Sequence, residues 1–298
     1  MPPHCSQMTG LSVAALPDWK GVTCPYCGEG TLGPLKHYAD SNGGWACRCN
    51  SKECKRRVLP HAFHSIFKCG TGQSHVSLAD QASVLFCSIA KCSQTSVRFL
   101  LQKNHALTES IYESLHAVRA KSVVQHEKNI KFGADLPWED VEADEVDIAK
   151  GEDPNTDAAT DKPVIWEQWG GMVQRGDQKP LVLFKLDPAK TKMRAPGPGP
   201  IRKRDWKPLA YKWITHHDVP DDSKPNKTKR VWVKAGTQII DRIWGEPRKH
   251  LGNKKTVNTK ALTNKIRSYQ WLYWHRGEGL WLATGKMLEE AFLKEHCQ

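Results

Sequence analysis

The sequence of 298 residues has no apolar run of the ~18 to 20 residues that a membrane-spanning helix needs, which excludes a spanning protein. Its N-terminus, MPPHCSQMTG, lacks the apolar core of a secretory signal, so we expect that the protein is not secreted. We expect a nuclear protein if the source is eukaryotic and a cytoplasmic one otherwise. No internal repeat is found. The hydrophobic fraction of 39% and the 12 tryptophans argue against global disorder.

Charge is unevenly distributed along the chain. Residues 135–162 contain eleven acids against two lysines, a net charge of −9. Residues 179–260 contain 21 lysines and arginines against seven acids, a net charge of +14. A basic half suits a polyanionic partner, because each cation placed near a phosphate releases counterions. A solvated basic surface is an equally good reading of charge alone.

Ten cysteines are present, and five of them lie between Cys24 and Cys54. Without a secretory signal, this clustering favours metal binding over disulfides. Cys24 and Cys27 form a CxxC knuckle, whose turn points backbone amides at two thiolates that can share one tetrahedral zinc. Four thiolates would close the coordination shell, so we expect a structural zinc ribbon.

The second half of the zinc site is ambiguous in the sequence. Cys54 belongs to both workable pairings, and either Cys47 or Cys49 can be its partner. We favour Cys47, because it follows the aromatic Trp45 near the end of an expected strand, and keep Cys49 as the alternative. The site is therefore expected to be Cys24, Cys27, Cys47 and Cys54.

The residue pattern predicts four segments in succession. They are a disordered tail over 1–20, the zinc ribbon over 21–68, a helical region over 75–130 and a larger α/β domain over 138–298. Helix, short break and helix over 78–103 resemble a helix-turn-helix, with Thr95 as the expected cap of the second helix. A simple helical connector fits the same pattern.

Within the last segment, residues 141–148, 164–174 and 180–186 are expected to form strands, and 201–213 to hold another. A helix is expected over 237–251, kinked or divided at Pro247.

Three aspartates stand out by context in the last segment. Asp144 lies on the alternating strand, where it shares a face with Glu142 and Val146. Asp205 follows a basic run, and Asp241 opens the expected helix. Carboxylates on two strands and a helix can converge at one edge of a sheet, where hard divalent cations such as magnesium find oxygen ligands. We expect these carboxylates to approach within several ångströms and, in the absence of metal, to raise the pKa of at least one of them.

The order of these features resembles a known family. Zinc ribbon, helical segment, Glu-Ala-Asp-Glu, paired strands, Ile-x-x-x-Asp-x-x-x-x-Ala-Tyr and Gln-x-x-Asp-x-x-Trp are similar to the transposases of the Merlin superfamily and their ISXO-type insertion-sequence relatives. The resemblance covers about residues 20–275. It implies a ribonuclease-H-like mixed sheet with flanking helices and a carboxylate triad of Asp144, Asp205 and Asp241.

The resemblance further implies Mg²⁺ or Mn²⁺ as the catalytic ion and double-stranded DNA as the substrate, which is cut and joined at transposon ends. Asp241 stands where the family usually has glutamate, which is one methylene longer. A non-catalytic DNA-binding protein with the same fold is the alternative. A homodimer is a further expectation. The expected DNA-binding residues are Lys55, Arg56, Arg57, Arg98, Arg202, Lys203, Arg204, Arg242, Arg248 and Lys249.

Overall fold

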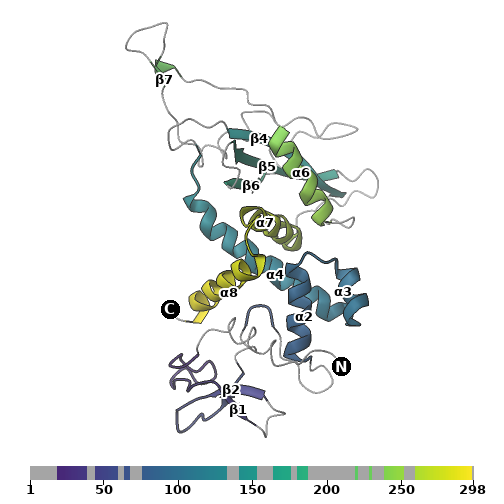
Figure 1. Ribbon diagram of the computed structural model, residues 1–298. Coiled ribbons are helices and arrows are strands. Elements are labelled where there is room, and N and C mark those ends of the chain that lie inside the picture. Colours follow the sequence, from purple (N-terminus) through teal and green to yellow (C-terminus); the bar gives the residue numbers. More distant parts are fainter. Residues whose placement is uncertain are drawn as a thin grey trace. The chain divides into compact units, whose positions relative to one another are not determined.

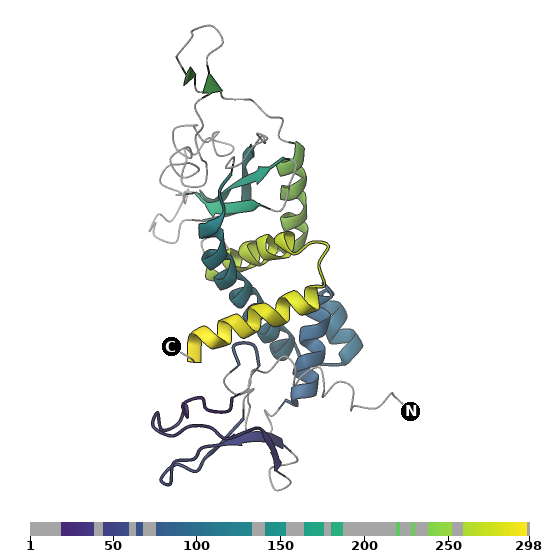
Figure 2. The same ribbon diagram turned by 60° about the vertical axis from the view of Figure 1, so that its left-hand side comes forward.

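The computed structural model describes part of the chain (Figures 1 and 2). The described residues are 19–38, 44–59, 64–67, 76–132, 141–152, 164–175, 180–186, 219–220, 228–229, 238–251 and 259–296. The chain divides into two compact units, one formed by residues 1–118 with 277–298 and the other by 119–276. The expected tail over 1–20 lies almost wholly outside the described residues.

The ribbon is a small antiparallel sheet in the order β1-β2-β3, and it begins the first unit. The strands are β1 (Lys36–Tyr38), β2 (Gly44–Arg48) and β3 (Arg57–Val58). Its core is small, because only six buried residues form it. These are Trp19, Cys24, Leu32, Cys47, Cys49 and Val58.

Four helices contribute to the first unit. They are α2 (Leu78–Ile89), α3 (Gln94–Leu101), the first part of α4 (His105–His126) and α8 (Leu280–His296). The expected pair of helices across a short break is therefore present. The cap of α3 is Ser93 rather than Thr95, because the Ser93 side chain accepts a hydrogen bond from the Ser96 amide at 3.0 Å.

The second unit is built on an antiparallel sheet in the order β4-β5-β6, shown in teal in Figure 1. Its strands are β4 (Val141–Glu152), β5 (Val164–Gln174) and β6 (Leu181–Lys185). All three expected strands are confirmed. β4 runs four residues further than expected, past an irregularity between Asp147 and Ala149.

Helices α6 (Gln238–Leu251) and α7 (Lys260–Trp274) pack against one face of this sheet (Figure 1). The core between them combines strand residues with helix residues. Its buried members are Val146, Ile148, Trp169, Val173, Leu181, Leu183, Ile240, Ile243, Trp244, Leu251, Leu262 and Ile266. The opposite face has its own cluster, in which Phe132 packs with Met172, Val182, Phe184 and Leu186. Successive side chains of β4, β5 and β6 thus point alternately into one apolar core and the other, as in any pleated sheet.

Pro247 does not end α6, contrary to one of the two expected outcomes, since the helix continues to Leu251. Proline has no amide hydrogen to donate to the carbonyl four residues earlier, which belongs to Ile243. The hydroxyl of Tyr269 on α7 donates to that carbonyl at 3.4 Å. The neighbouring helix therefore supplies a donor where the proline removes one.

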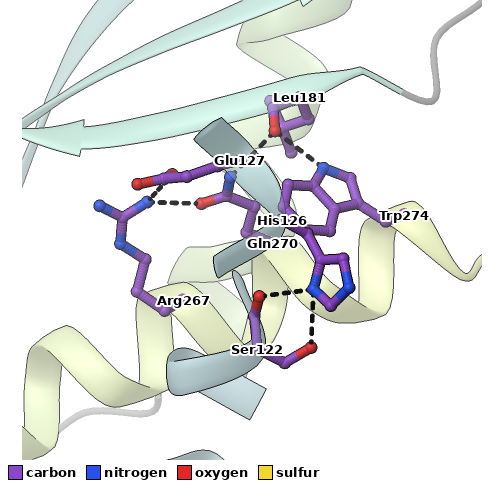
Figure 3. A network of polar contacts seen from close by, with 7 residues as sticks. All are labelled: Ser122, His126, Glu127, Leu181, Arg267, Gln270 and Trp274. Atoms are coloured by element: carbon purple, nitrogen blue, oxygen red, sulfur yellow. Dashed lines mark hydrogen bonds and ion pairs between the residues drawn. The ribbon is translucent and has the colours of Figure 1, made fainter. Parts of the chain in front are cut away.

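A polar network links the 3₁₀ turn that follows α4 (Glu127–Asn129), helix α7 and the first residue of β6 (Figure 3). Arg267 bonds Glu127 and also donates to Gln270 at 3.1 Å. The Leu181 carbonyl then accepts from Gln270 at 3.0 Å and from Trp274 at 2.8 Å. His126 is held separately, within α4, by the Ser122 carbonyl at 2.8 Å. These bonds fix α7 along β6.

The architecture described is mixed α/β, with six α-helices and two three-stranded antiparallel sheets among the described residues. A short pair, β7 (Val219–Pro220) and β8 (Thr228–Lys229), is also present. The mixed sheet of a ribonuclease-H-like fold would need a further strand, and the one expected over 201–213 lies outside the described residues. None of the helices searched in the described part of the chain combines the length and apolar character needed to cross a bilayer.

Candidate metal centres

Four cysteine thiols of the ribbon converge on one point. The ligand atoms of Cys24, Cys27, Cys49 and Cys54 all lie within 4.8 Å of one another. The sulfurs of Cys24 and Cys54 are 3.9 Å apart, and those of Cys27 and Cys49 are 3.8 Å apart. Zinc–sulfur bonds of ~2.3 Å in a tetrahedron place neighbouring sulfurs about 3.8 Å apart. The four thiols therefore fit a structural zinc ion.

Cys47, which we expected to be the third ligand, is not part of this group, and Cys49 takes its place. Cys47 lies on β2 opposite Val58 and is fully buried in the ribbon core. Cys49 lies just beyond the end of β2, two residues closer to Cys54. A two-residue step along a strand covers about 6.6 Å, which is more than the whole width of the sulfur cluster. The shorter Cys-x₄-Cys spacing was the signal that favoured Cys49.

Backbone amides hold the first knuckle as the CxxC pattern predicts. The Gly30 amide donates to the Cys27 sulfur at 3.4 Å. Hydrogen bonds from the Gly30 and Glu29 amides lower the pKa of the Cys27 thiol to about 7. Burial instead raises the pKa of the Cys49 thiol to about 12. Without a cation, four ionised thiolates would be strongly disfavoured here, as expected of a site that binds metal and releases protons together.

Gly30 has a steric role at this centre. A Cβ at this position would lie 2.4 Å from the Cys49 sulfur and 2.8 Å from the Ser51 Cβ. Only glycine therefore allows the first knuckle to approach the second this closely.

The ribbon surface carries the expected basic residues. Lys55, Arg56 and Arg57 are exposed. The Arg56 guanidinium lies over the Tyr26 ring at 5.3 Å, and that of Arg57 over the Tyr38 ring at 4.2 Å. Both arginines are thereby oriented by cation–π contacts.

The second candidate centre lies where α6 crosses β4. Asp144 lies on β4, opposite Gly171 of β5, and Asp241 lies in the first turn of α6. Burial raises the pKa of the Asp144 carboxyl, and the Asp241 charge and a hydrogen bond between the two carboxyls raise it further. The expected approach of these two acids and the expected raised pKa are therefore both found. The shorter aspartate at position 241 still reaches its partner.

Gly171 allows α6 to lie this close to the sheet. A Cβ on Gly171 would lie 2.6 Å from the Trp244 ring and 3.0 Å from Ile240. Both of those side chains belong to α6 and are buried. The absence of a side chain at Gly171 thus brings the helix that carries Asp241 down onto the strand pair that carries Asp144.

Glu142 was recognised from the sequence only as a residue on the same face as Asp144. The structure gives its carboxylate three hydrogen bonds. One oxygen accepts from the Ile239 amide at 2.7 Å and the Ile240 amide at 3.1 Å, and the other from Arg175 at 2.8 Å. Its side chain is fully buried. Nothing in the sequence indicated that Glu142 would bind the amides at the start of α6.

The remaining expected residues divide into two groups. Arg98 and Arg242 are exposed on α3 and α6. Asp205, Arg202, Lys203 and Arg204 lie outside the described residues, and Arg248 and Lys249 are on α6 with side chains that are not described. Within the described part of the chain, the four cysteines are the only group of three or more close metal-ligating side chains. The two aspartates have the oxygen donors that magnesium and manganese prefer, but as a pair they do not make up such a group.

Comparisons of the chain with protein-family models, with curated proteins and with solved structures gave no match.

Proposed function

We propose that the protein is a DNA transposase-like enzyme that cleaves and joins DNA strands by metal-dependent phosphoryl transfer. The observation that supports this most directly is the meeting of Asp144 and Asp241, which are 97 residues apart in sequence. A half-buried carboxyl such as Asp144, whose pKa is raised by burial and by a neighbouring carboxylate, is typical of a functional site. The family resemblance described above is the second support.

In this proposal, Asp144 and Asp241 bind Mg²⁺ or Mn²⁺ together with Asp205, which lies outside the described residues. The ions would activate the attacking oxygen and stabilise the leaving one. Asp144 and Asp241 orient the site by holding the ions between strand and helix. No covalent protein intermediate is needed.

The zinc ribbon is proposed to be structural and to hold duplex DNA. Its described residues contain six lysines and arginines and two glutamates, so its surface is basic. The basic stretch around Arg202, Lys203 and Arg204 is proposed to hold further phosphates. Binding should weaken steeply with salt, since phosphate contacts release counterions.

The test is a cleavage assay with the full-length, zinc-loaded protein. Labelled duplexes carrying the terminal repeats that flank the coding region are incubated with Mn²⁺ or Mg²⁺. We expect strand cleavage that Asp144→Asn abolishes while duplex binding remains, because the change removes one charge and little surface. Asp241→Glu should preserve or increase cleavage. Duplex binding without cleavage, by both the unmodified protein and Asp241→Glu, would instead identify a non-catalytic DNA-binding protein.

A further inference from the structure

Glu142 is a buried acid that is not among the proposed metal ligands. Its two oxygens are occupied by three donors, namely the Ile239 and Ile240 amides and the Arg175 guanidinium. A carboxylate committed in this way is poorly placed to bind a metal ion as well. The three donors also compensate its charge, because the helix N-terminus carries partial positive charge and Arg175 a full one.

The position of Glu142 relates it to both aspartates. On β4 it is two residues before Asp144, so the two side chains leave the same face of the strand. On α6 the amides that it accepts from belong to the two residues directly before Asp241. One carboxylate therefore joins the strand that carries one aspartate to the helix turn that carries the other.

We infer that Glu142 is a positioning residue, which fixes the first turn of α6 so that Asp241 faces Asp144. This inference rests on the proposed function. Apolar packing at Gly171 sets how closely α6 approaches the sheet, and the Glu142 bonds set the position of its first turn along β4. Because the amides before Asp241 are bound by a side chain of β4 itself, a shift of this turn along the strand would break both bonds.

Glu167 provides a matched control on the same sheet. It is likewise buried, and it pairs with Lys185 at 2.9 Å and accepts from Trp169 at 3.0 Å. Its partner in the strand register is Ala149, at the other end of β4 from Asp144. Removal of either glutamate takes away a buried carboxylate together with its ion pair and its hydrogen bonds, so both changes should lower thermal stability.

The experiment measures Mn²⁺ affinity by electron paramagnetic resonance on the full-length, zinc-loaded protein, together with the melting temperature. We expect Glu142→Ala to weaken Mn²⁺ binding by at least tenfold, as loss of a supporting residue around a metal site typically does. Glu142→Gln keeps the side-chain shape and one acceptor oxygen, so it should recover part of the affinity. Glu167→Ala should lower the melting temperature and leave Mn²⁺ affinity within about twofold, since it lies outside the supporting shell.

Two outcomes separate failure of this inference from failure of the proposed function. If Asp144→Asn abolishes Mn²⁺ binding but Glu142→Ala does not weaken it, the positioning role is refuted and the metal site stands. If the unmodified protein binds no Mn²⁺ beyond the level of Asp144→Asn, the metal site itself is refuted, and the inference falls with it. An equal loss of affinity in Glu142→Ala and Glu167→Ala would show a general loss of stability and would also overturn the positioning role.

A second inference rests on an independent feature, the turn that ends α2. Lys91 adopts a left-handed conformation with φ of 62°, and the Cys92 amide donates to the Cys87 carbonyl at 3.0 Å. This six-residue closure is the Schellman motif, in which the side chains of the two residues joined by the closing bond often contact each other. Here both are cysteines, and the neighbouring Cys92 thiol, after burial, raises the pKa of Cys87.

The turn is also held from outside. The Tyr112 hydroxyl on α4 donates to the Cys92 carbonyl at 2.7 Å. Both thiols are partly exposed, and neither belongs to the zinc site. The backbone turn therefore keeps the two cysteines as neighbours, and their thiols interact.

We propose that Cys87 and Cys92 form a dithiol site that is oxidised to a disulfide by a low-molecular-weight disulfide such as oxidised glutathione. The Cys92 thiolate attacks one glutathione sulfur and releases a glutathione thiolate. The Cys87 thiolate then attacks the Cys92 sulfur of the mixed disulfide and releases the second. The protons of the two protein thiols pass to the two glutathione thiolates.

The test exposes zinc-loaded protein to oxidised glutathione and maps the thiols by mass spectrometry without reduction. We expect a Cys87–Cys92 disulfide, with Cys47 of the ribbon core still reduced. Cys87→Ser should accumulate the glutathione adduct at Cys92, because the resolving thiol is missing. A persistent Cys92 adduct in the unmodified protein, or unreacted thiols at both positions, would overturn the proposal.

Discussion

The ribbon and the sheet unit achieve their cores by different means. Three of the six buried residues in the ribbon core are cysteines. The main core of the sheet unit has twelve buried apolar residues, and no cysteine is among them. A core as small as that of the ribbon rarely supplies enough hydrophobic free energy to fold alone. From this comparison we expect the ribbon to depend on metal binding and the sheet unit on close packing.

The largest expected effect is therefore loss of zinc. Cys49→Ser should abolish zinc binding and unfold the ribbon, since structural zinc contributes on the order of 10 kcal/mol or more to such modules. The zinc content of the purified protein measures the loss of metal, and the NMR amide resonances of the ribbon residues measure the unfolding. Cys47→Ala is the control and should keep the metal, at a modest loss of stability from the small cavity it creates. Zinc loss in Cys47→Ala with retention in Cys49→Ser would reverse our assignment of the ligands.

The next largest effect tests the packing of the sheet unit. Gly171→Ala places a methyl group against the Trp244 ring, so we expect a loss of about 1 to 3 kcal/mol in the unfolding free energy. Zinc content should not change. Gly245→Ala on α6 is the control, because no atom lies within 4 Å of its added Cβ. That change should stabilise by up to about 1 kcal/mol through helix propensity. Equal effects of the two changes would show that α6 does not press on Gly171.

The smallest expected effect concerns the bond that spans the proline break in α6. Tyr269→Phe removes the donor to the Ile243 carbonyl and should cost about 0.5 to 1.5 kcal/mol, measured by denaturant unfolding. Tyr273→Phe, one turn along α7, is the matched control. If Tyr269→Phe lowers the unfolding free energy no more than Tyr273→Phe does, water hydrogen-bonds the Ile243 carbonyl as well as Tyr269 does.

The same residue predicts a pH dependence. Burial raises the pKa of the folded Tyr269 above its ordinary value of 10.0. The unfolded chain then loses this proton at a lower pH than the folded chain does. Stability is therefore complete below pH 10 and falls as the pH rises further. Tyr269→Phe should show a shallower alkaline fall, which unfolding curves at pH 9 and pH 11 can measure.

The sequence predicted the elements whose periodicity is strong. The strand over 164–174 has the expected bounds, and the alternation through Glu142, Asp144 and Val146 holds. It misplaced details that depend on local turns. Ser93 rather than Thr95 caps α3. The next helix, α4, starts at His105, where the Asn104 side chain accepts from the Leu107 amide at 2.8 Å. Several residues in each case have capping chemistry, so composition alone does not choose between them.

The candidate sites were predicted to a similar extent. The number of zinc ligands and three of their identities follow from spacing, whereas the choice between Cys47 and Cys49 depends on where β2 ends. Of the expected triad, Asp144 and Asp241 interact, and Asp205 lies outside the described residues. The roles of Gly171 and Glu142 could not be predicted, because each arises from a helix that lies more than 60 residues further along the chain.

The anchoring of Glu142 to α6 has a consequence for how this sequence can diverge. The Glu-x-Asp spacing on β4 and the two-residue step from its bound amides to Asp241 are both fixed by backbone geometry. The 85 residues between β4 and α6 do not enter that relation. Insertions and deletions in that interval are expected to be tolerated wherever they spare β5, β6, Arg175 and the neighbourhood of Asp205. A single-residue insertion between Glu142 and Asp144 would instead turn one of the two acids to the opposite face of the strand.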